Sequence, residues 1–392
     1  MPNSVQIIHI CQDEKFINAA VTQFEYCFPN SNTFYAVTQN PTSDYKHING
    51  KPFIHKILPQ EAVALAHNIP KSTLVILHSL SPFFIDFVLQ LPKKNKIIWL
   101  CFGFEVYNDT HYFEEEELLE KLTRTSFPNP PISRKKRIKE HLRPWYRIFK
   151  PGLELSRKEK KQKAIARIDF LGSSFSEEYA QVGKLIQQRK QFFNFWYYPL
   201  ELIVDVTDLI YLPKKNLLIG NSGFKSGNHL DVFHAIKTFS IPTDAQVIVP
   251  LNYGESAYIQ EILVSGKKHF KTMFYPLLNF MPLYEYNTLL ESVGVAIFNN
   301  KRQQAVGNTI ALLWFGTKVF LSNKNSFYHY LKRKGAIVYC YETELNEQSI
   351  SQFLSLEQME HNRKILFQEL NQAHLADVLK QQINRIYAKI TL

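Results

Sequence analysis

Short apolar runs alternate with amphipathic stretches along nearly the whole chain. The runs are rich in Val, Ile, Leu and Phe, and the stretches that follow them repeat apolar residues at helical spacing. This alternation is typical of β-α-β units, whose parallel strands are covered by helices on both faces. We predict strands at residues 5–10, 33–37, 74–77, 96–101, 168–171, 192–197, 217–220, 246–250, 272–275, 295–298, 317–321 and 336–339.

The same pattern predicts helices at 16–28, 82–91, 114–122, 228–238, 258–266, 285–293, 304–315, 327–334, 355–371 and 373–389. The alternation is interrupted at 199–215, where Pro199 and Pro213 indicate a linker, and it resumes at Leu217. We therefore predict an α/β protein with two doubly wound domains that face each other across a cleft. The expected domains are 1–200 and 201–372, and a last helix at 373–392 could pack back on the N-terminal domain.

The composition fits a folded protein of this size and places its charge in one segment. The chain has 392 residues, 45% of them hydrophobic and 14% aromatic, which suits two large cores and excludes global disorder. The formal charge is +11, and residues 131–167 alone hold fourteen Lys and Arg against three Glu. The net charge of this segment, which we call the basic insert, equals the net charge of the whole chain. We therefore expect the rest of the surface to be close to neutral.

The cysteines and the hydropathy exclude several classes of protein. Cys11, Cys27, Cys101 and Cys340 are scattered and show no CxxC or Cys/His spacing, so we expect reduced thiols in a cytosolic protein and no zinc. The first residues lack a basic and apolar signal segment, and no apolar run reaches about 18 residues. We therefore expect neither a signal peptide nor a transmembrane helix.

The loop after the predicted strand 217–220 is a candidate anion site, because ligands of open α/β sheets bind beyond the carboxyl ends of strands. Its sequence is Gly220-Asn221-Ser222-Gly223, and Asn228 and His229 open the next helix. Glycines let a backbone approach an anion closely, and a helix N-terminus offers donors to phosphate. An ordinary strand-to-helix turn would look similar, since the loop matches neither a Walker loop nor GxGxxG.

Two further loops of the C-terminal half are polar. After strand 246–250, Tyr253 could stack on a ligand and Gly254 permits a tight turn, although an ordinary loop remains an alternative. Residues 299–308 form the densest polar cluster of this half. Within it, Lys301 and Arg302 could balance a pyrophosphate. Gln304 and Asn308, one helical turn apart, could form hydrogen bonds with sugar hydroxyls or phosphate.

One loop of the N-terminal half carries a candidate general base. Glu105 is a lone carboxylate among the aromatic residues of segment 99–107, which follows strand 96–101. Apolar surroundings raise the pKa of a carboxyl group and suit a general base, although a surface or helix-capping glutamate would fit as well. No Asp-x-Asp follows a predicted strand, so we expect cations and helix N-termini, rather than a metal, to neutralise a diphosphate.

These segments together resemble a known family. Their pattern is Gly220-Asn221-Ser222 with Asn228-His229, Val249-Pro250-Leu251-x-Tyr253-Gly254, Pro282-x-x-Glu285-Tyr286 and Asn299-x-x-Arg302-Gln303-Gln304-x-x-Gly307-Asn308. It resembles the TDP-N-acetylfucosamine:lipid II N-acetylfucosaminyltransferases, also called 4-alpha-L-fucosyltransferases, of glycosyltransferase family 56. Segment 99–107 is similar to that family's Trp-x-x-Trp-Gly-x-Asp-x-Tyr, with Phe102 and Glu105 as departures. The resemblance covers roughly 70–340 and leaves the basic insert outside.

The resemblance implies a GT-B fold, with a TDP-sugar on the C-terminal domain and the acceptor on the N-terminal domain. It implies inverting, metal-independent and cofactor-free transfer of 4-acetamido-4,6-dideoxygalactose, or a related deoxysugar, to a polyprenyl-pyrophosphate-linked saccharide in bacterial surface polysaccharide synthesis. Glu105 would deprotonate the acceptor, and Arg302 and Lys301 would stabilise the departing diphosphate. The expected donor-binding residues are Gly220, Asn221, Ser222, Gly223, Asn228, His229, Tyr253, Gly254, Tyr275, Phe280, Glu285, Asn299, Lys301, Arg302, Gln303, Gln304, Gly307 and Asn308.

The basic insert interleaves its cations with aromatic and aliphatic residues. Trp and Tyr favour the lipid headgroup zone and Lys and Arg attract anionic lipid, so we predict peripheral docking at the cytoplasmic face of the inner membrane. A solvated pair of charged helices would have the same composition. The residues expected to dock are Arg134, Lys135, Lys136, Arg137, Trp145, Tyr146 and Arg147.

Two other functions remain open on the sequence alone. A GT-B transferase with another nucleotide sugar and another acceptor would share the two domains and the anion-binding loops. A nucleic-acid-binding protein could use the basic, aromatic insert, but the polar loops at the strand ends would then have no purpose.

Overall fold

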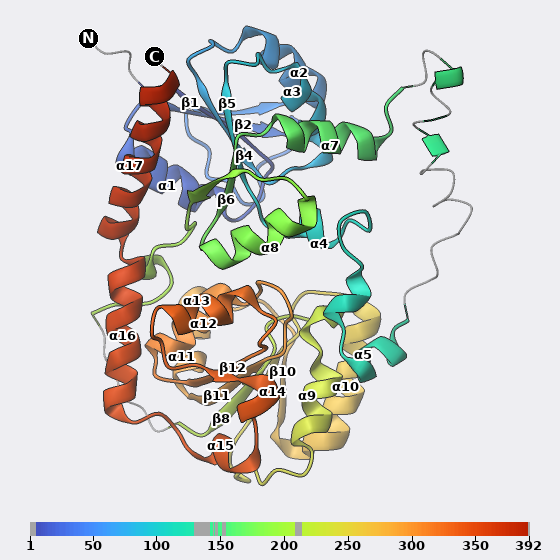
Figure 1. Ribbon diagram of the computed structural model, residues 1–392. Helices are drawn as coiled ribbons and strands as arrows, with labels where there is room; N and C mark the ends of the chain where they lie inside the picture. Colours follow the sequence, from blue (N-terminus) through green and yellow to red (C-terminus); the bar gives the residue numbers. More distant parts are fainter. Residues whose placement is uncertain are drawn as a thin grey trace.

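The computed structural model of the protein describes residues 5–128, 142–143, 145, 148–150, 154–207 and 214–390. Figure 1 shows two α/β domains, one above the other, with α16 (Leu356–Leu370) and α17 (Gln372–Ile390) running along one side. Among the described helices, none is both long and apolar enough to span a bilayer.

The N-terminal domain is built on a seven-stranded sheet in which every pair of neighbours is parallel. The strand order reverses between β1 and β4, which makes the edge beyond these two strands a topological switch point. In spatial order the strands are β3 (Ile54–Ile57), β2 (Asn32–Val37), β1 (Ile7–Cys11), β4 (Leu74–His78), β5 (Lys96–Leu100), β6 (Phe170–Ser173) and β7 (Gln191–Asn194).

The C-terminal domain repeats this order in a six-stranded parallel sheet, with its switch point between β8 and β11. The two sheets therefore offer equivalent positions for ligands. In spatial order the strands are β10 (Phe274–Leu277), β9 (Val247–Pro250), β8 (Asn216–Ile219), β11 (Val293–Phe298), β12 (Lys318–Leu321) and β13 (Tyr339–Cys340).

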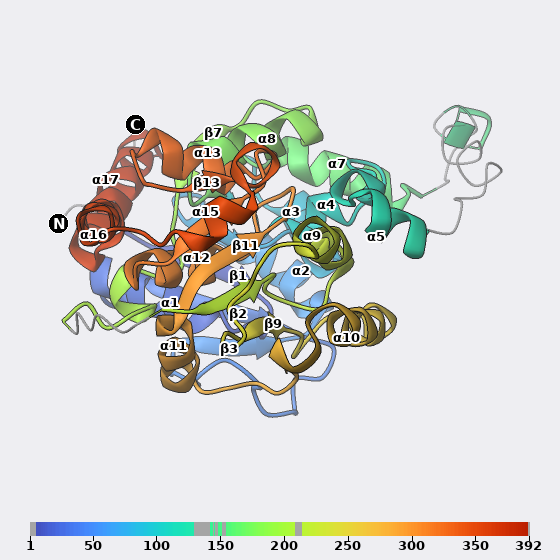
Figure 2. The ribbon, with the colours of Figure 1, turned by 90° about the horizontal axis from the view of Figure 1, so that it is seen from below.

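Helices cover both faces of each sheet (Figure 2), so the central strands are buried along their whole length; β11 is apolar throughout, and β4 is apolar up to its last residue, His78. The helices of the N-terminal domain are α1 (Ile17–Cys27), α2 (Pro59–Asn68), α3 (Ile85–Gln90), α4 (Phe104–Tyr107), α7 (Arg157–Arg167) and α8 (Ser176–Ile186). Those of the C-terminal domain are α9 (His229–Ile236), α10 (Ser256–Phe270), α11 (Leu283–Glu291), α12 (Val306–Trp314), α13 (Ser326–Arg333), α14 (Tyr341–Glu344) and α15 (Glu347–Ser351).

The chain returns to the N-terminal domain at its end. Helix α17 packs against α1 and β7, where Leu379 and Ile383 join a core cluster with Phe24. The side chain of Gln382 exchanges hydrogen bonds with the backbone of Asn194 at 2.7 and 2.9 Å. Helix α16 packs on α12 of the C-terminal domain, so α16 and α17 together tie the two domains from outside (Figure 1).

A second crossing involves residues 115–127, which we call the strap. The strap comprises a 3-10 turn (Glu115–Leu118), α5 (Lys121–Ser126) and Phe127, and it lies on α9 of the C-terminal domain. Asp231 of α9 caps α5 by accepting hydrogen bonds from the backbone N–H groups of residues 122 and 123. The strap therefore contacts the C-terminal domain although it lies within residues 1–200, which the sequence assigned to the N-terminal domain.

The two domains also meet directly where α8 contacts α13. The ring of Phe175 stacks on Tyr330 at 5.0 Å, and the Ser326 hydroxyl donates to Glu178 at 2.5 Å. At the solvent edge, Arg333 pairs with Glu177. An apolar seam with polar ends therefore holds the domains together on this side.

Each predicted strand overlaps an observed one, but several elements were not predicted, namely β3, α2, α4, α7, α8, α14 and α15. The expected helix at 114–122 is instead broken at residues 119 and 120. There Leu119 has ψ of 138° and Glu120 donates its backbone N–H to Asn228 at 2.8 Å. A tertiary contact, which local periodicity cannot reveal, has replaced the helical hydrogen bonds at this point.

Candidate functional site

A cleft of about 870 Å³ lies between the carboxyl ends of the two sheets. Its lining residues come from loops after β1, β5, β6 and β7 on one side and after β8, β9 and β11 on the other. Both switch points open onto it, and its volume falls within the range of ligand sites. The cleft is therefore the candidate functional site.

The C-terminal wall of the cleft is polar and contains the N-terminus of α12. Ala305, which caps this helix, has a φ of 57°, a left-handed conformation that costs a Cβ-bearing residue about 1–2 kcal/mol. Strain of this kind persists where a site needs it. The donor-binding residues expected from the sequence that line this wall are Asn221, Tyr253, Arg302, Gln303, Gln304, Gly307 and Asn308.

Several buried polar atoms gather at the ends of β8 and β11. Within the described part of the chain, they have no hydrogen-bond partner. Buried polar atoms in proteins are nearly always paired, so this cluster indicates a polar ligand or water at the switch point. The atoms are Asn221 Oδ1, His229 Nε2, Asn299 Nδ2 and Oδ1, Asn300 Oδ1 and Arg302 Nε.

Arg302 extends from the C-terminal wall toward the N-terminal domain. Its guanidinium carbon lies 5.4 Å from the centre of the Tyr107 ring, and its Nη1 lies 3.6 Å from where a Cβ on Gly103 would be. Burial lowers the pKa of Arg302, and the nearby groups of Tyr107, Glu178 and Glu105 oppose this shift. A cation held in a dry, preorganised setting is suited to an anionic ligand.

The glycines of the 220–223 loop serve packing rather than direct contact with the cleft. Gly220 has φ of +69°, and a Cβ there would lie 2.1 Å from His229 Nε2. A Cβ on Gly254, at φ +142°, would meet the backbone of Gly223 at 2.2 Å. The sequence predicted glycines that admit an anion, whereas these glycines admit the His229 ring and a neighbouring loop. Gly220, Ser222, Gly223 and Gly254 do not line the cleft.

His229 is fully buried beneath this loop. Its backbone N–H donates to the Tyr258 hydroxyl at 2.9 Å, and its Nδ1 lies 3.2 Å from the same oxygen. Burial lowers the pKa of His229 to about 4, so the ring is neutral at pH 7. A neutral imidazole beside the second switch point can exchange a hydrogen bond without adding charge.

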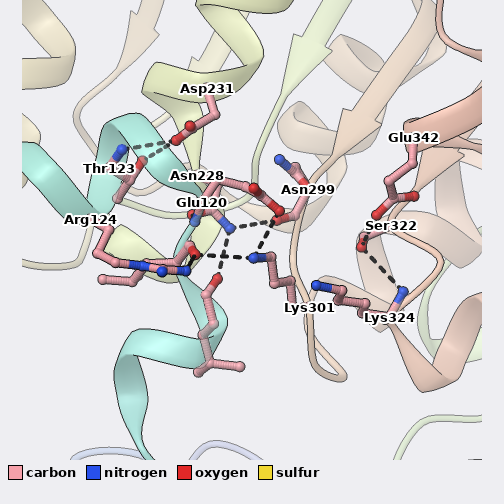
Figure 3. A network of polar contacts seen from close by, with 12 residues as sticks. Glu120, Thr123, Arg124, Asn228, Asp231, Asn299, Lys301, Ser322, Lys324 and Glu342 are labelled. Atoms are coloured by element: carbon pink, nitrogen blue, oxygen red, sulfur yellow. Dashed lines mark hydrogen bonds and ion pairs between the residues drawn. The ribbon is translucent and has the colours of Figure 1, made fainter.

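Lys301 and Asn228 bind the strap instead of facing the cleft, as Figure 3 shows. The Lys301 ammonium lies 2.8 Å from Glu120 Oε1 and donates to the Leu119 carbonyl at 3.0 Å. The amide of Asn228 donates to the carbonyls of Leu118 and Asn299 at 2.9 and 2.8 Å. The sequence predicted Lys301 as a counter-ion to diphosphate. In the structure its charge is paired with Glu120 and its side chain does not line the cleft.

Three more expected donor-binding residues lie outside the cleft lining. Tyr275 and Phe280 are exposed near the end of β10, and Phe280 stacks on Tyr253 with ring centres 6.0 Å apart. Glu285 is exposed in the first turn of α11, while its neighbour Tyr286 lines the cleft. Helical rotation therefore brings Tyr286 to the cleft, where its hydroxyl accepts from Asn308 at 3.1 Å.

The N-terminal wall is aromatic, and sequence reasoning missed most of it. Phe16, Phe102 and Tyr197 meet with ring centres 5.3–5.7 Å apart, and Phe104 and Tyr198 extend the wall. Aromatic faces of this kind stack on the C–H groups of sugar rings. The aromatic run 192–198 was the available signal, but the pattern was assigned only to a strand.

Glu105 lies beneath this wall and not in the cleft lining. Its Oε1 accepts hydrogen bonds from Trp99 Nε1, the Phe102 backbone N–H and the Leu80 backbone N–H at 3.0, 3.0 and 3.3 Å. Burial raises the pKa of the Glu105 carboxyl, while these donors oppose the shift. The sequence predicted a free carboxylate that faces the cleft. In the structure Glu105 is buried, and its hydrogen bonds hold the loop of Phe102 in place. Among the described lining residues, the carboxylate is Glu14, which sequence reasoning treated only as part of a turn.

The predicted membrane-docking segment lies largely outside the described residues. This applies to Arg134, Lys135, Lys136, Arg137, Tyr146 and Arg147. Trp145 is described and 67% exposed. Three apolar neighbours are also exposed, Leu142, Ile148 and Phe149.

Comparison with known families finds one matching model over residues 178–382, just over half of the chain. Its description is 4-alpha-L-fucosyltransferase, glycosyl transferase group 56. The match contains the whole C-terminal wall of the cleft.

Comparison with solved structures finds likenesses over nearly the whole chain. A sucrose-phosphate synthase from Thermosynechococcus elongatus matches with a TM-score of 0.65 and 9% identity, over 98% of this chain and 100% of that one. An α,α-trehalose 6-phosphate synthase from Burkholderia multivorans matches with a TM-score of 0.62 and 9% identity, over 99% and 98%. Both are glycosyltransferases of the GT-B type, so the GT-B fold expected from the sequence is confirmed.

Proposed function

This chain belongs to the 4-alpha-L-fucosyltransferase family, glycosyl transferase group 56, and we propose that it transfers 4-acetamido-4,6-dideoxygalactose from a TDP-sugar to a polyprenyl-pyrophosphate-linked saccharide. The family and the fold make it a glycosyltransferase that takes a nucleotide-sugar donor and a saccharide acceptor. The identity of the sugar, the nucleotide and the lipid carrier is the proposed part. This reaction would serve the synthesis of a bacterial surface polysaccharide.

The observation that carries the proposal is the cluster of unpartnered buried polar atoms beside Arg302 at the second switch point. A diphosphate there would accept hydrogen bonds from Arg302 and the first backbone N–H groups of α12. Among the described residues lining the cleft, the cations are Lys15 and Arg302. These two side chains, with the helix N-terminus, would balance the charge of the leaving TDP without a metal.

The walls suggest an inverting displacement. The acceptor hydroxyl would lie on the aromatic N-terminal wall and lose its proton to a general base as its oxygen bonds to the anomeric carbon. The bond from that carbon to the TDP oxygen breaks on the opposite face, and the electron pair leaves with the diphosphate beside Arg302. Glu14 is the base that its place in the cleft lining favours, in the role that the sequence assigned to Glu105.

A membrane-docking surface would fit a lipid-linked acceptor, and the exposed apolar residues of the insert support this proposal. Trp145 and Phe149 are 67% and 80% exposed, and the surrounding insert supplies the basic residues that attract anionic lipid. We propose peripheral binding at the cytoplasmic face of the inner membrane. Sedimentation with vesicles containing anionic lipid should pull down the protein at low salt, and replacing Trp145 and Phe149 by Ser should weaken this binding. Equal binding to neutral vesicles would contradict it.

The deciding experiment is thermal stabilisation by a panel of nucleoside diphosphates, followed by a transfer assay. At a concentration of 100 times Kd, TDP should stabilise the protein by about 2.7 kcal/mol, with a weaker effect of UDP, GDP and ADP. TDP-4-acetamido-4,6-dideoxygalactose and the lipid-linked saccharide should then give a product heavier by one sugar residue. Preference for another nucleotide would instead favour a GT-B transferase with a different donor.

A further inference from the structure

A chain of buried polar side chains leads from the surface of the N-terminal domain to its cleft wall. Asn32 on β2 hydrogen-bonds His9 on β1 at 3.2 Å, and His9 Nδ1 lies 3.1 Å from His78 Nε2 on β4. His78 Nδ1 in turn lies 2.8 Å from the Tyr197 hydroxyl. These residues occupy the first switch point, and the nucleotide-binding proposal uses none of them.

The direction of every hydrogen bond in this chain is fixed from its outer end. The Asn32 Nδ2 group donates to Glu25 Oε1 at 2.6 Å and to the Phe28 carbonyl at 2.8 Å, and both partners can only accept. The Asn32 Oδ1 atom must therefore face His9, and an amide oxygen can only accept. His9 consequently carries its proton on Nε2 and presents a bare Nδ1.

The same logic continues to the cleft. A bare Nδ1 on His9 requires His78 to donate from Nε2, so His78 presents its own bare Nδ1 to Tyr197. The Tyr197 hydroxyl must then donate its proton inward. The hydroxyl has one proton, so the remaining lone pair of its oxygen can only accept.

The surroundings keep both histidines neutral and oriented. His9, His78 and Asn32 are all buried, and the His9 ring stacks on Phe34 with centres 3.9 Å apart. Burial lowers the pKa of His78 to about 3 and that of His9 well below its usual value. A neutral imidazole has one donor and one acceptor, which is what the direction of the chain requires.

Tyr197 lies where a saccharide would meet this chain. Its ring lines the cleft and contacts Phe102 edge-on at 5.3 Å, between the loops that follow β5 and β7. A sugar lying on the Phe102 and Phe16 rings would bring its hydroxyl groups to the edge of this aromatic wall. An acceptor atom of fixed polarity at that edge selects a hydroxyl that donates.

We infer that the buried chain from Asn32 to His78 positions Tyr197, whose phenolic oxygen accepts a hydrogen bond from a hydroxyl group of the saccharide acceptor. His9 and His78 are positioning residues, and Tyr197 is the residue that touches the substrate. The inference rests on the proposed function, because it needs a saccharide on the N-terminal wall. It adds the polarity of the binding group, which selects sugars that carry a free hydroxyl at that position.

The polarity can be tested without turnover. Two-bond ¹H–¹⁵N correlation spectra of histidine-labelled wild-type protein distinguish the two neutral tautomers of each ring. The signals of His9 and His78 are identified by their loss in His9→Asn and His78→Asn. We expect the Nε2–H tautomer for both residues. A proton on Nδ1 of His78 would reverse the direction of the chain and overturn the inference.

The binding role is tested by steady-state kinetics with the lipid-linked saccharide as the varied substrate. Tyr197→Phe removes the acceptor oxygen and should raise KM for the saccharide about three- to tenfold, while the Kd for TDP stays unchanged. Tyr26→Phe, which alters a tyrosine exposed on α1, is the matched control. An unchanged KM for the saccharide in Tyr197→Phe would overturn the inference.

The positioning role is tested by two substitutions of one histidine. His78→Asn keeps an acceptor near the position of Nδ1, whereas His78→Leu removes it. The KM for the saccharide should therefore be lower in His78→Asn than in His78→Leu. Equal KM values in the two folded variants, verified by TDP binding, would overturn this role. If wild-type protein neither binds TDP nor transfers sugar, the proposed function and the inference fall together. The wrong histidine tautomer would overturn the inference alone.

Discussion

The two walls of the cleft are built on sheets of the same strand order, yet their side chains are of opposite kinds. The C-terminal wall presents Arg302, two glutamines, three asparagines and a helix N-terminus. The N-terminal wall presents aromatic rings, and its charged groups are confined to Glu14 and Lys15 after β1. A polar wall suits a diphosphate and an aromatic wall suits a sugar, so the fold sets the positions while the loops set the chemistry.

The difference extends to the first loop of each domain. After β8, glycines let His229 and a neighbouring loop approach the backbone. The equivalent loop after β1 contains no glycine and reads Gln12-Asp13-Glu14-Lys15-Phe16. The N-terminal loop thus projects Glu14, Lys15 and Phe16 into the cleft, whereas the glycines of the C-terminal loop pack against their own domain and its Asn221 lines the cleft.

The largest effect should come from the carboxylate of the aromatic wall. Glu14→Gln should lower kcat by about 10²–10⁴, because it removes the proposed general base while leaving the wall intact. Glu105→Gln should lower kcat much less, since Glu105 does not line the cleft. It should lower the melting temperature, because Gln keeps an oxygen for the three hydrogen bonds to Oε1 but places an amide N–H₂ group at Oε2, which is buried without a partner among the described residues. Turnover measured with saturating donor and acceptor, together with melting curves, compares the two variants.

The opposite outcome would be equally informative. Near-normal turnover in Glu14→Gln and a loss of several orders of magnitude in folded Glu105→Gln would return the role of base to Glu105, as the sequence predicted. TDP binding by both variants serves as the control for an intact C-terminal wall.

The next effect concerns the polar wall. Arg302→Ala should lower kcat by about 10²–10³ and weaken TDP binding, because it removes a preorganised cation beside the leaving group. Lys301→Ala is the matched variant, since Lys301 is adjacent in sequence but bound to Glu120. It should lower the melting temperature and leave the Kd for TDP unchanged, as measured by calorimetry. A loss of TDP affinity in Lys301→Ala that equals that of Arg302→Ala would contradict the distinction.

A smaller effect should appear in the pH dependence of stability. The pKa of His229 is about 4 in the folded protein against about 6.5 when unfolded, so the unfolded chain takes up the proton first as the pH falls. The stability that is present above pH 6.5 is therefore lost toward pH 4, by about 2 kcal/mol at pH 5. Urea unfolding of His229→Asn should show a loss between pH 7 and pH 5 that is smaller by this amount.

Other groups do not affect this comparison. The pKa values of Glu105 and Glu178 are raised by burial, which changes stability in the opposite direction, but both carboxyls are present in wild type and variant. His234→Asn, which alters an exposed histidine on the same helix, is the control. A pH dependence in His229→Asn identical to that of wild type would show that the buried ring is not neutral.

The sequence predicted the two domains and the polar wall because both depend on local order. Strands appear as apolar runs, and the rule that ligands bind beyond strand ends directs attention to residues 299–308 without any tertiary information. Seven of the expected donor-binding residues line the cleft for this reason.

The remaining roles depended on partners far away in the sequence. Lys301 faces Glu120, which lies 181 positions earlier, and no local pattern reveals that contact. The aromatic wall is assembled from the loops after three strands, β1, β5 and β7, so its members are scattered in the sequence. Glu105 accepts a hydrogen bond from Leu80, 25 positions earlier, and one from the Trp99 side chain. These contacts make it a structural residue of the loop, which its local sequence does not reveal.

The strap has a mechanical consequence for the basic insert. One end of the insert follows Phe127, which packs against Tyr258 of the C-terminal domain with ring centres 5.2 Å apart. The other end of the insert is α7, which packs on α3 of the N-terminal domain. A rotation of one domain against the other that moves α9 and α10 relative to α3 would change the distance between these two attachment points. A bilayer that binds the insert would therefore influence the opening and closing of the cleft between the two domains.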